Sequence, residues 1–294
     1  MQIVHTITES GAQSSKLFNA AHIYSSLNRK MIAPVDGGGN AQAFALNLKV
    51  YSAAANTVTL KTASNSYVTK QAVKAWFKVW RQKFSEAGIS MKDLGPYGRV
   101  FKPRLTASDP VLGSGLEAGR GEWNYSDVVT VPAITSASTT DELAAAEMYD
   151  QYSLHLCGDS TATSGDGSGH QTRRFDNVGM ITSWLGSRRK YAGADSGDGS
   201  EIQEDSVFDQ DNPLILARGG DSASEVLLDE VRDLQKDEPP YTESDFTDPF
   251  TQAIVNSNAD LMGHCDILAP CGLVQVTTTA ACTLVFTLVG IGDM

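Results

Sequence analysis

The stretch VQVTTTAACTLVFTLVGIGDM, residues 274–294, decides the fold. Its segment 282–289 is dense in Thr, Val, Leu and Phe, and β-branched and aromatic residues are favoured in strands. Earlier in the chain, AFALNLKVY at 43–51 alternates apolar and polar residues with the period of a half-buried strand. Both segments therefore predict strands. The strong strand preference of the later one indicates that it is flanked by a neighbour on each side.

Several further segments have the composition of strands. They are NTVTLK at 56–61, which we expect to pair with 43–51, and then RVFKPRL at 99–105, YSDVVTVP at 125–132, MYDQYSLHLCG at 148–158 and GLVQVTT at 272–278.

Two helices are expected between the strands. The first begins after Thr69, a capping residue, and ends at Gly88, because apolar and aromatic residues recur between them at helical spacing. The second begins at Ser222, which forms a capping-box pattern with Glu225, and runs to about residue 234.

These elements amount to about seven to nine strands, without the regular alternation of strand and helix that a parallel sheet needs. We therefore expect an all-β fold: an antiparallel, eight-stranded jelly-roll sandwich with helical insertions, with a double jelly roll as the alternative. In a jelly roll the first and last strands are adjacent, so 43–51 and 281–289 are expected to be neighbours. Residues 1–40 are expected to form an N-terminal arm. Residues 41–294 are expected to form the jelly-roll domain, with insertions at about 62–97 and 193–260.

The sequence contains no motif of a known catalytic or cofactor site, so we expect neither an enzyme nor a bound cofactor or metal. His264, Cys265 and Cys271 are potential zinc ligands, but their spacing matches no common site, and a Cys265–Cys271 disulfide is left open. The segment DSGDGSEIQED at 195–205, within the acidic stretch 193–212, would suit calcium, although it lacks the register of an EF-hand loop.

The formal net charge of −12 counts against nucleic-acid binding over the whole surface. Region 61–104 is the exception, because it is rich in Lys and Arg interleaved with Trp76 and Trp80. The residues expected to form an inter-subunit or nucleic-acid patch are Lys70, Lys74, Lys78, Arg81, Arg99, Lys102 and Arg104. Two other interpretations remain: an exposed helix face with the tryptophans packed inward, or docking of this basic region onto the acidic region 193–260 of a neighbouring copy.

The order of these features resembles a known family. The glycine-broken segment APVDGGGNA at 33–41 precedes a strand pair and an inserted amphipathic helix, and the sequence closes on a β-branched strand. The segments DNPLILARGGDSASEVLLDEVRDLQKDEPPY at 211–241 and ILAPCGLVQV at 267–276 add to the likeness. The chain resembles a jelly-roll major capsid protein of a small tailless icosahedral virus, of the DNA virus or phage type.

This resemblance implies a structural coat protein that self-assembles into an icosahedral shell in the host cell and resides in the virion. The implied partners are copies of itself, as trimers or as pentamer and hexamer capsomers, together with the viral genome, an internal lipid layer or minor capsid proteins. No small-molecule substrate is implied. Many coats of this kind carry an Arg-rich N-terminal arm, which this chain lacks, so the basic patch, lipid or another protein would meet the genome. We expect segments 1–35, 62–97 and 193–260 to make the contacts between subunits.

A secreted carbohydrate- or calcium-binding β-sandwich module is the alternative function. Such a module would bind its ligand through loops at one end of the sandwich. The N-terminal stretch lacks the charged start and apolar core of a signal peptide, which counts against this alternative.

Overall fold

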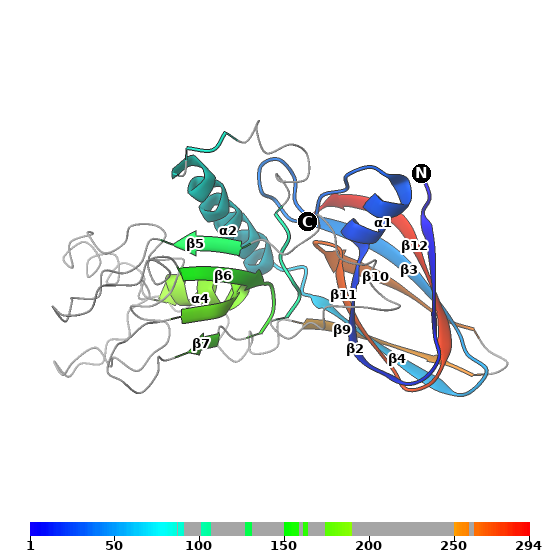
Figure 1. Ribbon diagram of the computed structural model, residues 1–294. Coiled ribbons are helices and arrows are strands. Elements are labelled where there is room, and N and C mark those ends of the chain that lie inside the picture. Colours follow the sequence, from blue (N-terminus) through cyan, green and yellow to red (C-terminus); the bar gives the residue numbers. More distant parts are fainter. Residues whose placement is uncertain are drawn as a thin grey trace, which may run out of the picture.

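The computed structural model describes residues 1–86, 88–90, 101–106, 127–130, 150–158, 161–163, 174–189, 250–258 and 262–294. These residues form a β-sandwich and a smaller lobe beside it (Figure 1). Most of the regular structure is strand, and the sheets of the sandwich are antiparallel. The prediction of an all-β sandwich is confirmed at this level. No helix in the described part of the chain is long and apolar enough to cross a membrane.

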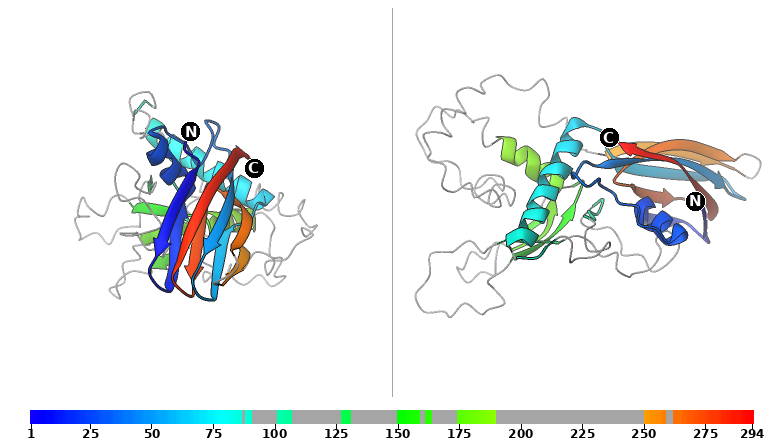
Figure 2. Two further views of the ribbon diagram at one scale, coloured as in Figure 1. Left: turned by 90° about the vertical axis from the view of Figure 1, so that its right-hand side faces the viewer. Right: turned by 90° about the horizontal axis from the view of Figure 1, so that it is seen from above.

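The first sheet, called sheet A, contains the strongly β-forming segment 282–289. Its order is β1 (Val4–Glu9), β12 (Cys282–Asp293), β3 (Gln42–Tyr51) and β10 (Gly263–Pro270). Strand β12 pairs with β1 on one side and with β3 on the other, as Figure 2 shows. The predicted pairing of 43–51 with 281–289 is therefore confirmed.

The second sheet, called sheet B, packs face to face against sheet A. Its order is β2 (Gln13–Asn19), β11 (Leu273–Thr278), β4 (Asn56–Ala63) and β9 (Phe250–Ser257). Strands β3 and β4 lie in different sheets, so the expectation that 43–51 pairs with 56–61 is wrong. The short connection 52–55 carries the chain from one sheet to the other, because each strand buries its apolar face in the shared core.

Residues 1–40 do not form the expected arm. They supply β1, β2 and the helix α1 (Ala20–Asn28), which Asn19 caps by accepting a hydrogen bond from the backbone N–H of His22. Next to the turn that joins β1 and β2, Lys16 Nζ lies 2.9 Å from Glu9 Oε2 in an ion pair that is largely buried. The N-terminal segment is thus an integral part of both sheets.

Aromatic side chains join the two sheets across the core. Phe18 of β2 stacks on Phe286 of β12, with ring centroids 3.8 Å apart and ring planes 13° apart. Tyr24 of α1 meets Phe18 edge-on and donates its hydroxyl hydrogen to the Phe286 carbonyl oxygen. Burial raises the pKa of Tyr24, so this hydroxyl keeps its proton.

The two ends of the sandwich differ in the length of their connections. Short turns at 10–12, 52–55 and 279–281 lie together at one end (Figure 1). Asn56, 3% exposed, holds the last of these turns, because its side-chain oxygen accepts hydrogen bonds from the backbone N–H groups of Thr279 and Ala280. The opposite end carries α1, the C-terminus and the connection from β4 to the helix α2 (Tyr67–Glu86) (Figure 1).

The described residues between β4 and β9 form the smaller lobe. It contains α2 (Tyr67–Glu86), α4 (Met180–Arg189) and a sheet with the order β5 (Asp127–Thr130), β6 (Asp150–His155), β8 (Arg174–Gly179) and β7 (Thr161–Thr163). Strands β6 and β8 are parallel, so this sheet is mixed, unlike the two antiparallel sheets of the sandwich. The expected insertion at 193–260 is wrong at its C-terminal end, because residues 250–257 are strand β9 of sheet B.

Other local predictions have mixed outcomes. The segment 125–132 contains β5 and 148–158 contains β6, whereas β9 and β10 have no counterpart among the predicted strands. Arg99, the helix expected at 222–234 and the acidic stretch 193–212 lie outside the described residues.

Replacing Phe18 tests whether the N-terminal strands belong to the core. Phe18→Ala should lower the free energy of unfolding by about 3–5 kcal/mol, because it removes a fully buried ring from between the sheets. Chemical denaturation measures this change. The control is Ile254→Ala, whose parent side chain is 58% exposed and whose effect should stay within about 0.5 kcal/mol. If Phe18→Ala left the free energy of unfolding unchanged, residues 1–40 would be a detached arm and not part of the core.

Candidate interaction surfaces on α2 and sheet A

Helix α2 forms close to where its sequence pattern places it. It begins at Tyr67, because Ser66 caps it: the backbone N–H of Thr69 donates to Ser66 Oγ. Thr69, the predicted cap, is fully buried inside the first turn. The helix ends before Gly88, whose φ of +70° suits the left-handed geometry that follows many helices.

The inner face of α2 is aromatic and buried. Trp76 is fully buried, and Trp80 packs between Phe77, Phe84 and Phe101 with ring centroids 4.8–5.8 Å away. The interpretation that the tryptophans pack inward is therefore confirmed. Because these aromatic side chains are buried, the opposite face of the helix is the one that remains exposed.

A glycine loop of the sandwich packs against the same helix. The carboxylate of Asp36 accepts hydrogen bonds from the backbone N–H groups of Gly38 and Asn40 and from the Asn40 side chain, which closes the loop. Gly39 then has a φ of +84°, and a Cβ at this position would overlap the ring of Phe77. The glycine run at 37–39 thus positions α2 against the sandwich.

The exposed stripe of α2 carries positive charge. We call it the α2 stripe and define it as Tyr67, Lys70, Lys74, Lys78 and Arg81. Lys70 and Lys74 are half-buried, whereas Lys78 and Arg81 are exposed. The four cations recur every three or four residues, which is the spacing of neighbours on one helix face.

No ion pair within the described part of the chain neutralises these four cations. The Arg81 guanidinium lies 5.8 Å from the centre of the Phe77 ring, which is a weak cation–π contact. Like charges four residues apart destabilise a helix by about 0.2–0.5 kcal/mol per pair, and Lys70–Lys74 and Lys74–Lys78 are two such pairs. The stripe is therefore a local concentration of cations on a protein of net charge −12.

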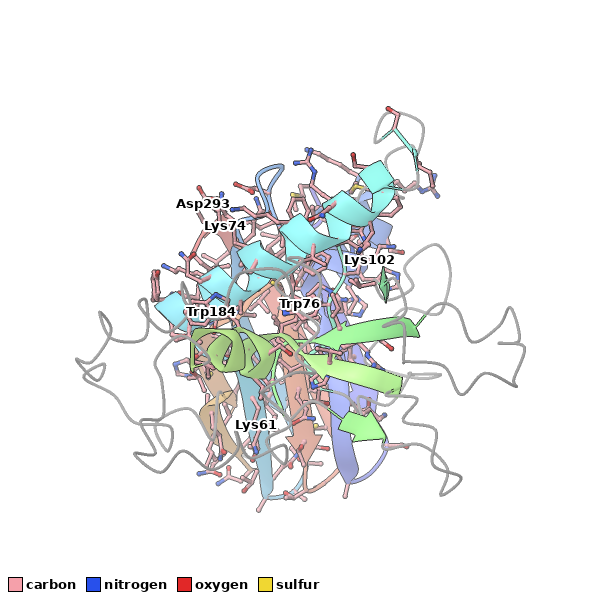
Figure 3. All side chains as sticks on the ribbon, turned by 90° about the vertical axis from the view of Figure 1, so that its left-hand side faces the viewer. Lys61, Lys74, Trp76, Lys102, Trp184 and Asp293 are labelled. Atoms are coloured by element: carbon pink, nitrogen blue, oxygen red, sulfur yellow. The ribbon has the colours of Figure 1, made fainter. Side chains whose placement is uncertain are left out.

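Two of the predicted patch residues do not lie on this surface. Lys102 and Arg104 are each 9% exposed, in a segment buried between the sandwich and the lobe. Burial and then the charge of Lys102 lower the pKa of His22, so Lys102 lies close to α1. Figure 3 shows Lys102 apart from Lys74. The backbone N–H of Arg104 donates to the Leu154 carbonyl oxygen, which aligns this segment with the end of β6.

The sequence reasoning missed one member of the stripe. Tyr67 is 65% exposed and lies three residues before Lys70, at the start of the helix. Its ring meets Trp184 of α4 edge-on at 6.1 Å, and Figure 3 shows Trp184 beside the start of α2. The sequence did indicate this membership, because Tyr67 lies at helical spacing from the lysines.

The outer face of sheet A offers a second surface, which is mostly uncharged. Side chains alternate along its strands, so Thr6, Thr283, Val285 and Thr287 point away from the core. At the end of the sheet where β1 begins and β12 ends, three apolar side chains are exposed: Val4 (42%), Leu268 (44%) and Val289 (69%). We call these three residues the apolar row.

The cysteines and histidines give no site of their own. All four cysteines are free, so the disulfide between Cys265 and Cys271 that the sequence left open does not form. Cys271 is fully buried, and burial raises its pKa to about 12, which disfavours the thiolate that binds zinc. Across the described residues, no group of three or more His, Cys, Asp or Glu side chains is placed to hold a metal.

Comparison of the chain with protein-family models, with curated proteins and with solved structures returns no match. The two surfaces and the topology that presents them are therefore the basis for assigning a function.

Replacing Gly39 tests how α2 is held. Gly39→Ala should lower the free energy of unfolding by about 2 kcal/mol, because the left-handed backbone strains a residue with a Cβ and the methyl group displaces Phe77. The matched control is Gly37→Ala, where a Cβ would meet no atom within 4 Å. Thermal denaturation of both variants gives the comparison. Equal effects at the two positions would show that the contact with Phe77 does not position the helix.

Proposed function

We propose that the chain is a jelly-roll coat protein that assembles with copies of itself into a closed shell. The observation that carries the proposal is the strand order, β1-β12-β3-β10 in sheet A and β2-β11-β4-β9 in sheet B. Strands β1 to β4 alternate between the two sheets, and so do β9 to β12. Two sets of four strands interleaved in this way are what a jelly roll, with its two Greek keys, requires.

The distribution of connections also supports a shell subunit. Short turns close one end of the sandwich, whereas α1, α2 and both chain ends lie toward the other (Figure 1). The apolar row lies exposed on the outer face of sheet A. A subunit of a closed shell needs such faces, because it must contact several neighbours at once.

Assembly is then the function, without turnover of a substrate. Specific contacts between proteins bury roughly 1,200–2,000 Å² in total. Contacts around a closed shell can be individually weak, because each one formed makes the next effectively intramolecular. Burying the apolar row would remove exposed apolar area from water and so favour association.

The test is the size of the protein expressed alone. We expect uniform particles tens of nanometres wide by light scattering and negative-stain microscopy. The double variant Leu268→Lys/Val289→Lys should remain folded but shift the equilibrium towards free subunits, because it places charge in the contact. The control is Ala53→Lys/Ala55→Lys, which adds the same charge at exposed positions in the turn between β3 and β4.

Two results would count against the proposal. A wild-type protein that stays monomeric at high concentration excludes a coat function. Monomers stabilised by added calcium or sugar would instead favour the β-sandwich binding module. Equal assembly of the two lysine variants would leave the coat function standing and remove the apolar row from the contact.

A further inference from the structure

We propose that the α2 stripe binds single-stranded nucleic acid. This inference deepens the proposed coat function, since it assigns a surface to the genome. The first evidence is the pattern of charge along the helix. Four of the five side chains of the stripe, those of Lys70, Lys74, Lys78 and Arg81, are cations, and none forms an ion pair with an acid of the described residues. A bound polyanion would relieve the repulsion between Lys70, Lys74 and Lys78 and so stabilise the helix.

The geometry of the stripe suits a linear anion. A helix rises about 1.5 Å per residue, so successive lysines are about 6 Å apart and Lys70 to Arg81 spans about 16 Å. The cations therefore follow one line along the helix, which matches one strand of a nucleic acid backbone better than a compact anion. Figure 1 shows α2 along its length on the lobe, and Figure 3 shows it crossing the end face of the molecule.

Tyr67 distinguishes a nucleic acid from an acidic peptide. Its ring is exposed at one end of the line of cations, and its edge-on contact with Trp184 limits the directions the ring can adopt. Unpaired bases stack on such rings, whereas carboxylate side chains gain little from them. The bases of a duplex are already stacked on each other, so this arrangement favours a single strand.

The salt dependence of binding follows from the number of cations. For single strands, log K falls with log of the salt concentration with a slope of about −0.7 for each phosphate that is neutralised. Four cations therefore predict a slope of about −3. The net charge of −12 opposes the approach of a polyanion, so binding is expected to be weak at high salt.

Fluorescence anisotropy with a labelled oligothymidylate of about 20 nucleotides tests the inference across a range of salt concentrations. Lys74→Gln/Lys78→Gln should halve the slope to about −1.5 and weaken binding. The matched control is Lys30→Gln/Lys49→Gln, which removes two cations from exposed positions on the sandwich and should leave the slope unchanged. Tyr67→Ala should weaken binding about tenfold, whereas Tyr67→Phe should preserve it.

Three results would overturn the inference: no binding by the wild type, equal losses in the α2 and control variants, or a duplex or polyglutamate bound as tightly as the oligothymidylate. Circular dichroism on each variant confirms that α2 is intact. Light scattering on the same samples reports assembly separately. Binding without particles would overturn the coat function and leave this inference standing. Particles without binding would overturn this inference and leave the coat function standing.

Discussion

Strand β12 lies between β1 and β3, and the stack of Phe286 on Phe18 ties it to the opposite sheet. The rest of the sandwich depends on this placement. Through β12 the first strand of the chain becomes part of sheet A, and through Phe18 the second strand is fixed in sheet B. The hydrogen bond from the Tyr24 hydroxyl to the Phe286 carbonyl oxygen connects α1 to β12 as well. The core therefore closes only when both ends of the chain are in place.

The sequence predicted this centre well, because the apolar and β-branched residues of 43–51 and 282–289 are dense enough to require burial. It predicted the edges poorly. β1 and β2 are short and polar, and their place in the core depends on Phe18 and on the Lys16–Glu9 ion pair, which are contacts made after the chain folds back. Strands β3 and β4 are separated by a short turn that looks like a hairpin. They lie in different sheets because the apolar face of each strand packs into the core between sheet A and sheet B.

The candidate site was predictable where helical spacing determines it. Lys70, Lys74, Lys78 and Arg81 share one face because of their positions in α2, and their aromatic neighbours turn inward for the same reason. Lys102 and Arg104 were assigned to the same surface because they are close in sequence. They are buried instead, since Phe101 packs against Phe77 and Trp80 and carries the segment inside. The contact of Gly39 with Phe77 is one that no local pattern reveals, whereas the helical spacing of Tyr67 from the lysines was readable in the sequence.

Native-state amide hydrogen exchange tests most directly whether β12 unites both ends of the chain. The account predicts that the hydrogen-bonded amides of β1 and those of 283–288 in β12 exchange with the same high free energy of opening, close to that of global unfolding. Rapid exchange throughout 4–9, with β3 and β12 still protected, would contradict it. That result would mean that sheet A is complete without the N-terminal strand.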